Sequence, residues 1–440
     1  MVFRLIKNNM LKKLFGFDES TMNIKTEVLA GLTTFMTMSY ILAVNPDILS
    51  AANMDKGSVF TATALSSAVA TIILAFVARL PFALAPSMGI NAFFAYTLVQ
   101  GMGYSWEAAL AAIFIEGIIF MLITVGNIRE KIVNSIPLNL RYAISVGIGL
   151  FIAFIGLKNA GIIQANSATF VTLGKFTPMS ILACFGILLS TALLWKNVRG
   201  GLFYSIIICT VIGIPFGVTI LPEGFSPVSM PQSMEPTFLK FDFAPLLTFD
   251  MIVVVLILIF MDIFNSVGTL VGAAAQANML DEKGNMPRMK QALLSDAIGT
   301  TFGAVCGTST VTTYIESASG IAEGGRSGIT AVTVGVLFLL ALFFSPLFLL
   351  VPSAATTGSL FVVGIMMMKT IREIKLTDLT EALPAFTIML TMVLTYSIAD
   401  GITLGLLSYT LIKILTGQFK QISPTLYVLS ILFILRFVFG

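Results

Sequence analysis

Residues 307–328 read GTSTVTTYIESASGIAEGGRSG, a run that holds far more polar side chains than the apolar segments on either side of it. Its first part, 308–314, is crowded with β-branched residues, which favour an extended backbone. Ser317, Ser319 and Gly320 then suit the start of a short helix, and the glycines of IAEGGRSG suit its end. The pattern predicts an extended piece that leads into a half-length helix.

The composition places the whole chain in a membrane. Its mean hydropathy is +0.97, and 57% of its 440 residues are hydrophobic while 11% are charged. A soluble core of this size cannot bury so much apolar surface. No cleavable signal peptide is apparent, because residues 1–26 carry five basic residues among short apolar runs. We therefore expect a multi-pass protein of the cell membrane whose amino-terminal segment, 1–26, lies in the cytoplasm.

Several chemistries are excluded or unsupported by the composition. The chain has no histidine, which excludes His-based acid–base catalysis and His metal ligation. Cys184, Cys209 and Cys306 lie in or beside apolar runs without metal-ligand spacing, so neither a disulfide framework nor a zinc site is predicted. The glycines of IAEGGRSG lack the GKS/T ending of a phosphate loop. We therefore predict no enzyme, no cofactor, no metal and no nucleic-acid partner, and an ion gradient as the energy source for any uphill transport.

Fourteen segments are candidate spans for about 30 Å of hydrocarbon, although several are short or interrupted. They cover residues 27–45, 60–78, 82–100, 106–125, 138–157, 177–195, 201–219, 249–277, 291–306, 308–322, 328–350, 354–369, 383–398 and 401–417. With the amino terminus inside and Arg436 set aside, twenty of the 25 Lys and Arg residues fall on the cytoplasmic side, which supports an even number of spans. We expect the apolar tail 424–439 to lie in the membrane interface, with a fifteenth span as the alternative.

The two halves of the chain repeat each other. Each has seven spans, and sequential repeats with an odd number of spans insert in opposite orientations, which predicts an inverted repeat. PFALAPSMGINAFFAY, residues 81–96, follows the same plan as 308–323: an extended part, a break and a short helix. Pro86 ends the extended part, and Gly89 permits close approach. Such a backbone is tolerated at membrane depth only where protein or a water-filled cavity satisfies it. We expect both half-helices to point their positive amino-terminal ends toward one site at the midplane.

Two acids inside these spans are the first candidates for function, because a charge at membrane depth is costly. Glu316 begins the second half-helix and is predicted to accept hydrogen bonds from ligand N–H groups and, with Asp262, to take part in ion coupling. The alternative is a cap that satisfies local backbone donors. Asp262 lies in IFMDIFNSVGTL with no basic residue within one or two helical turns, and we predict that it carries a proton. Asn265 and Thr269 follow on the same helical face, and a polar seam between helices is the alternative for this stripe.

Other polar and aromatic residues near the breaks are weaker candidates. Asn91 offers a donor and an acceptor and is predicted to orient the ligand, with packing as the alternative. Ser87 and Ser317 complete the predicted polar lining. Phe264 is the aromatic candidate for stacking on a flat ring. Further aromatic residues lie near the breaks, and packing is the commoner role for any one of them: Phe35, Phe93, Phe94, Tyr96 and Tyr314.

Two more intramembrane acids are predicted to be structural. Glu116 lies in IFIEGIIF and Asp296 in LLSDAIGT, and a paired structural acid is the preferred interpretation of each.

Five ordered motifs carry a family resemblance: GLTTFMTMSYILAVNP, ALAPSMGINAFFAY, FMDIFNSVGTL, SDAIGT and GTSTVTTYIESASGIAEGGRSG. From about residue 15 to 419 the chain resembles the adenine/guanine/hypoxanthine permeases, a branch of the nucleobase-cation symporter-2 type within the nucleobase/ascorbate transporter superfamily. The resemblance implies the all-α polytopic fold of the uracil permease, with fourteen spans in two inverted repeats. It divides the chain into core segments 27–125 and 249–350, gate segments 138–219 and 354–417, and an extracellular linker loop, 221–249.

The resemblance also implies a function and a set of site residues. Asn91, Asp262 and Glu316 fall on the family's substrate positions, whereas Asn265 stands where many relatives have a second acid. The expected function is import of adenine, guanine or hypoxanthine by proton symport through an elevator mechanism, in a homodimer that contacts through the gate. Two alternatives stay open: a sodium-coupled nucleobase symporter that uses oxygens of Asp262, Asn265 and Thr269, and an anion carrier of the related sulfate-transporter architecture.

Overall fold

A computed structural model describes residues 10–126, 137–222, 224–276, 279 and 286–439. Within these residues almost all regular structure is helical, and four short strands form two antiparallel pairs. Eight of the helical segments are long and apolar enough to cross a membrane. The chain is therefore a mostly helical, polytopic membrane protein, as its composition predicts.

Between residues 24 and 247 the described part of the first half contains ten helices and three strands. In chain order they are α2 (Ile24–Met38), α3 (Ile41–Ser50), α4 (Lys56–Val77), β1 (Leu84–Pro86), α5 (Met88–Ala92), the π-helix η1 (Phe93–Gly101), α6 (Trp106–Val125), α8 (Leu138–Asn159), β2 (Ile163–Asn166), β3 (Phe170–Leu173), α9 (Pro178–Trp195), α10 (Gly201–Gly213) and the short 3₁₀ helix η2 (Ala244–Leu247) that precedes the second half. Side-chain oxygens cap the amino-terminal ends of several helices. Asp55 accepts a hydrogen bond from Ser58 N at the start of α4, and Ser105 accepts one from Ala108 N at the start of α6.

The second half runs from α11 to the carboxyl-terminal helix. Its elements are α11 (Phe249–Gln276), α12 (Met289–Cys306), β4 (Val311–Thr313), α13 (Ser317–Ala322), α14 (Gly328–Ala341), η3 (Leu342–Phe344), α15 (Ser345–Leu349), α16 (Ser353–Met367), η4 (Met368–Glu373), α17 (Leu379–Leu394), α18 (Ile398–Leu415), η5 (Phe419–Gln421) and α19 (Pro424–Phe439). Every predicted span overlaps a helix, or a strand followed by a helix. The apolar tail 424–439 forms the helix α19, which is compatible both with a segment in the membrane interface and with a fifteenth span.

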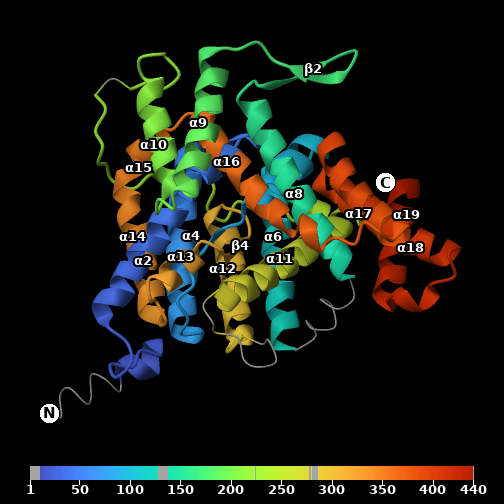
Figure 1. The fold of residues 1–440 in the computed structure, drawn as a ribbon, viewed down its shortest axis with the longest axis horizontal. Coiled ribbons are helices and arrows are strands. Elements are labelled where there is room, and N and C mark those ends of the chain that lie inside the picture. Colours follow the sequence, from blue (N-terminus) through green and yellow to red (C-terminus); the bar gives the residue numbers. More distant parts are fainter. Residues whose placement is uncertain (1–9, 127–136, 223, 277–278, 280–285, 440) are drawn as a thin grey trace.

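Three features of the fold were not predicted. The segment after α8 forms a hairpin of β2 and β3 that projects from the top of the molecule (Figure 1). Residues after α5 wind as the π-helix η1 instead of an α-helix. The linker loop is bound to the helix ends, since Leu239 N donates to Val305 O and Ser229 N donates to Phe343 O, both at 2.9 Å. None of these features has a hydropathy signature, because each depends on local backbone geometry or on contacts made across the fold.

The helices pack in two groups. In one, α2, α4, α6, α12 and α14 contact one another and surround β1, β4 and α13. In the other, α8 contacts α16 and α17, α9 contacts α10 and α16, and α17 contacts α18. Figure 1 shows α17, α18 and α19 at one end of the molecule and α2 and α14 at the other. Both broken spans therefore lie in the first group.

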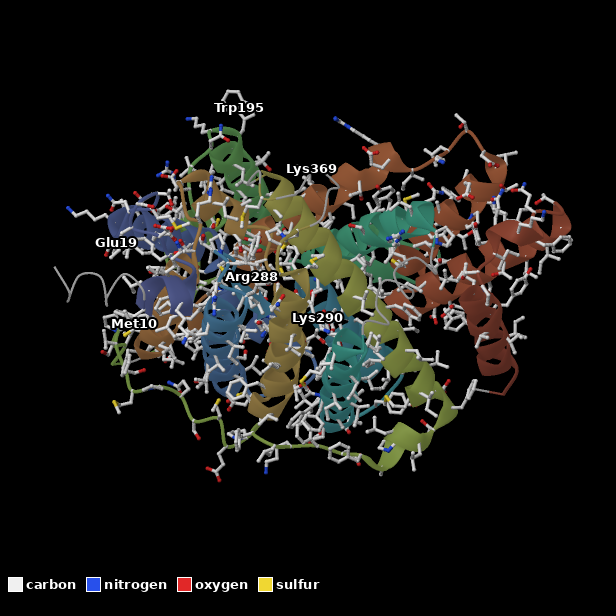
Figure 2. The ribbon with its side chains drawn as sticks, turned by 90° about the horizontal axis from the view of Figure 1, so that it is seen from below. Met10, Glu19, Trp195, Arg288, Lys290 and Lys369 are labelled. Carbon is white, nitrogen blue, oxygen red and sulfur yellow. The ribbon has the colours of Figure 1, made fainter. Side chains whose placement is uncertain are left out.

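Basic side chains close two helix ends on one face of the molecule. Arg288 Nη1 donates to Ala78 O at 3.2 Å, just after α4, and Lys290 Nζ donates to Val125 O at 3.0 Å, at the end of α6. Arg288 and Lys290 are labelled in the view from below, at the beginning of α12 (Figure 2). Cations at the carboxyl ends of helices offset the partial negative charge there, so these contacts stabilise that face.

Candidate substrate-binding site

The two broken spans meet in a short β-ladder. β1 and β4 pair antiparallel over three residue pairs, and all six residues are buried. One further bond extends the ladder at each end, from Ser87 N to Thr310 O and from Tyr314 N to Ala83 O, both at 2.9 Å. Protein groups thus satisfy an extended backbone deep in the molecule, which is the condition for such a backbone in a membrane. Because the strands are antiparallel, α5 and α13 begin at opposite ends of the ladder, separated by on the order of 10 Å along it.

Side chains complete the bonding of β1. Thr71 Oγ1 accepts from Leu84 N at 2.9 Å, and Ser317 Oγ accepts from Ala83 N at 3.0 Å. Ser317 therefore does not cap α13, contrary to the sequence expectation: Glu316 occupies the N-cap position, and its side chain makes no capping bond. The Ser317 hydroxyl is fully buried and bound to backbone in this conformation.

Glu316 is held by a tyrosine from the first span. Tyr40 lies in the turn between α2 and α3, is fully buried, and donates its hydroxyl to Glu316 Oε1 at 2.6 Å. Glu316 itself is partly exposed. One oxygen of its carboxyl group is thus fixed by a buried donor, and a carboxylate held in this way suits an acceptor for ligand N–H groups.

A close helix contact brings Glu316 to Tyr40. α13 packs against α2 at Gly320, where a Cβ atom would overlap Thr34 Oγ1 and the carbonyl oxygen of Ala30. A residue with a side chain at Gly320 would push the two helices apart. The glycine therefore positions the acid.

Asp262 lies on α11 and is fully buried. Ser266 donates its hydroxyl to Asp262 Oδ1 at 3.1 Å, one turn along the same helix. The other partner is unexpected: the side chains of Asp262 and Glu116 share a hydrogen bond. Glu116 is also fully buried, on α6, and its Oε2 accepts from Thr310 Oγ1 at 2.9 Å. The structure thus pairs Glu116 with the predicted proton carrier.

Asn265 joins α11 to the ladder. Its side-chain amide donates to Ser87 Oγ at 3.0 Å and to Thr312 Oγ1 at 3.1 Å. Asn265 is partly exposed, whereas Ser87 is buried. The predicted site residues Ser87 and Asp262 are therefore connected through Asn265, one helical turn after Asp262.

Asn91 lies inside a buried polar cluster. Its Nδ2 donates to Asn45 Oδ1 at 2.5 Å, and its Oδ1 accepts from the Ser309 hydroxyl. Asn45 Nδ2 in turn donates to Thr63 and Thr308 at 2.7 and 2.8 Å. Both asparagines are fully buried, so in this conformation Asn91 positions the start of the second broken span.

The remaining candidates divide into two cases. The backbone of Phe264 belongs to α11, but its side chain lies outside the described part of the structure, so its role in stacking stays a prediction. Asp296 accepts from Thr313 Oγ1 at 2.9 Å and is fully buried. Asp296 and Glu116 thus each bind a threonine at one end of β4.

Sequence reasoning missed Tyr40 and Asn45 as members of this centre. Both lie within GLTTFMTMSYILAVNP, and the only sequence signal is a hydroxyl and an amide close together in an apolar span. Their contacts with the second broken span, Tyr40 with Glu316 and Asn45 with Thr308, join residues more than 200 positions apart, so no local pattern could have identified them.

A polytopic helical protein whose buried polar side chains gather at two broken spans has the design of a membrane transporter. The chain belongs to the Permease family, whose family model matches residues 25–404. It is 42% identical to the adenine permease AdeP of Escherichia coli strain K12, over 98% of this chain and 96% of that protein. It is also 42% identical to the guanine/hypoxanthine permease PbuG of Bacillus subtilis strain 168, over 98% of this chain and 100% of that protein. The predicted resemblance to nucleobase permeases is confirmed.

A solved structure supports the fold independently. The transmembrane domain of a cyanobacterial bicarbonate transporter, BicA, superposes with a TM-score of 0.66 over 85% of this chain and 96% of that chain. The two sequences are 15% identical, so this likeness concerns the fold alone.

Proposed function

We propose that this chain imports purine nucleobases across the cell membrane by proton symport. The observation that carries the proposal is Glu316, a partly exposed acid held by buried Tyr40 at the start of a half-helix. Adenine, guanine and hypoxanthine all present ring or exocyclic N–H groups, and a fixed carboxylate accepts hydrogen bonds from such groups. The adenine and guanine/hypoxanthine permeases among the relatives support this substrate class.

The other site residues take roles that follow from their surroundings. Asp262 is shielded and bonded to another acid, which suits a proton site more than a ligand contact. Asn265 lies on the same helix as Asp262 and bonds Ser87 at the α5 end of the ladder, and in this proposal Ser87 is part of the polar lining of the site. Asn91 orients the ligand by fixing the half-helices, and Phe264 stacks on the ring.

The substrate is not assigned to the cavity of about 310 Å³ between α6 and α11. Aliphatic side chains and Phe260 line that cavity, so it offers a base no hydrogen-bonding partner from a side chain. A nucleobase bound there would lose its bonds to water without replacement.

Alternating access in this proposal comes from movement of a core against a gate. The core comprises 27–125 and 249–350, and the gate comprises 138–219 and 354–417. The two packing groups described above match this division, which supports it. Fourteen spans, a cytoplasmic amino terminus and a homodimer contacting through the gate complete the arrangement.

The test is uptake into proteoliposomes containing the purified full-length protein. Radiolabelled adenine, guanine, hypoxanthine, uracil and sulfate are offered with an inward proton gradient, with an inward sodium gradient, and with neither. We expect purine accumulation that requires the proton gradient and is abolished by a protonophore. Sodium-dependent accumulation that resists the protonophore would show that the coupling ion is sodium. Uptake of sulfate without purine uptake would favour the anion carrier, which Glu316 disfavours by repulsion.

Purine binding to Glu316→Gln, measured by equilibrium binding on the same preparations, tests the role of the acid. We expect at least about a tenfold loss of affinity, because an amide cannot replace a carboxylate as a charged acceptor. Unchanged purine binding and uptake would show that Glu316 does not contact the base.

A further inference from the structure

The candidate for a second functional acid is Glu116, which the sequence assigns to a structural role. Glu116 lies on α6 and is fully buried. One of its oxygens, Oε2, accepts from Thr310. The other, Oε1, receives no hydrogen bond from any donor group among the described residues. A fully buried carboxyl oxygen left in this way requires another explanation.

That explanation is the carboxyl group of Asp262, with which Glu116 shares a hydrogen bond. Two ionised carboxylates are both acceptors only, so a hydrogen bond between them requires a proton on one of them. A buried pair without that proton would hold two negative charges side by side in a medium of low dielectric constant. A proton shared between the two carboxyl groups would account for this contact.

From this geometry we propose that Glu116 and Asp262 together form the proton site of the transport cycle, with one proton shared between their carboxyl groups. The inference rests on the proposed function, because it concerns the ion that drives purine import. The proton enters bound to one carboxyl oxygen, bridges to the other acid, and leaves to water when the site opens to the cytoplasm. No covalent bond other than O–H forms or breaks.

A closed path of contacts links this pair to the substrate region. Glu116 binds Thr310 Oγ1, and the carbonyl of Thr310 accepts from Ser87 N at 2.9 Å. Ser87 Oγ accepts from Asn265, which lies one turn from Asp262 on α11. Loss of the proton would force the two acids apart, and the strain would act on Ser87 and on the start of α5. The proton and the base are thereby coupled.

Few other charged groups face the pair from the elements packed against α6. Asp296, on α12, binds Thr313 at the other end of β4. Lys290 lies at the start of α12 and binds the carbonyl of Val125 at the end of α6. Asp250 lies in the first turn of α11 and Glu107 in the first turn of α6. The acid whose side chain bonds Glu116 is Asp262.

The experiment compares the wild-type protein with Glu116→Gln and Glu116→Asp in proteoliposomes. A glutamine keeps a hydrogen bond to Asp262 through its amide but cannot hold a shared proton. We expect proton-driven hypoxanthine or adenine accumulation by Glu116→Gln to fall by about tenfold, while exchange of labelled for unlabelled purine without a gradient falls by less than about threefold. Purine-induced proton entry, followed with an internal pH dye, should disappear. Glu116→Asp should restore proton entry with a shifted pH profile. The matched control is Glu107→Gln, on the same helix, for which no change is expected.

Each result decides the inference. Wild-type proton entry and accumulation in Glu116→Gln would overturn it while leaving the proposed function intact. Equal loss of exchange and accumulation in both Glu116 variants would overturn it in favour of a structural acid. If the wild-type protein takes up no purine, or only with sodium, the proposed function fails and the inference fails with it.

Discussion

The hydrogen bond from Tyr40 to Glu316 makes a sharp prediction about substrate affinity. Tyr40→Phe removes one hydroxyl and keeps the ring, so the fully buried packing of residue 40 is retained. A hydrogen bond to a charged group contributes about 1.5–3 kcal/mol. Because Glu316 is partly exposed, water replaces part of the lost bond, and we take the lower end of that range. We therefore expect purine to bind about tenfold more weakly, since about 1.4 kcal/mol corresponds to a factor of ten in Kd.

The assay is equilibrium binding of radiolabelled purine to purified protein, together with a thermal unfolding curve for each variant. Tyr409→Phe is the matched control, because Tyr409 is also buried but its hydroxyl bonds Gln421 O in α18 and η5, away from the broken spans. We expect the control to bind like the wild type. A Kd for Tyr40→Phe within twofold of the wild type, with a normal unfolding curve, would refute the claim that Tyr40 positions Glu316 for the base.

Three further changes test the frame of the site. Thr71→Val leaves the N–H of Leu84 without its partner, and a buried unsatisfied group costs about 1–3 kcal/mol, so the unfolding temperature should fall. Gly320→Ala should weaken purine binding more than it lowers stability, because its methyl group meets Thr34 and moves α13 away from α2. Asp47, on α3, accepts hydrogen bonds from the hydroxyls of Ser353 and Thr356 on α16. Asp47→Asn removes the charge from this contact and should let α3 and α16 separate more often, so a cysteine placed beside it should react faster with an impermeant thiol reagent. The purine Kd should stay within about twofold of the wild-type value.

Each of these changes has a control of the same kind elsewhere. Thr191→Val removes an exposed hydroxyl on α9 and should leave the unfolding temperature unchanged. Ser319→Ala places a methyl-sized side chain on α13 and should keep purine affinity. Lys420→Gln removes an exposed charge and should leave the labelling rate unchanged. If a control behaves like its partner variant, the contact named for that variant is not the cause of its effect.

The sequence predicts the broken spans because their evidence is local. β-branched residues followed by Ser and Gly in 307–328, and Pro86 before Gly89 in the first half, specify an extended part and then a short helix without any distant contact. β1, α5, β4 and α13 occur where this pattern predicts them. The pairing of β1 with β4 joins residues more than 200 positions apart and was not predicted from the sequence.

The partners of the buried acids could not be predicted from the sequence either, because these contacts also join residues far apart in the chain. Glu116 and Asp262 lie in separate apolar helices, and nothing in IFIEGIIF or IFMDIFNSVGTL states that the two face each other. Assignment of Glu116 to a structural pair was reasonable for a single buried acid. The structure makes a purely structural role for Glu116 less suitable, because its partner is another acid. A structural pair would join Glu116 to a cation or to neutral donors.

Glu316 and Asp262 are both acids inside predicted spans, but their surroundings make the free energy of losing a proton different for the two. Two ionised carboxylates side by side in a medium of low dielectric constant repel each other, so the buried contact between Asp262 and Glu116 requires a proton on one of them. Among the described residues, the hydrogen-bond partner of the Glu316 side chain is the Tyr40 hydroxyl and not a second acid. A charged acceptor for the base and a site that exchanges one proton make opposite demands on an acid. In the proposed mechanism these demands are met by separate elements: Glu316 at the start of α13 binds the purine, and Glu116 on α6 with Asp262 on α11 binds the proton.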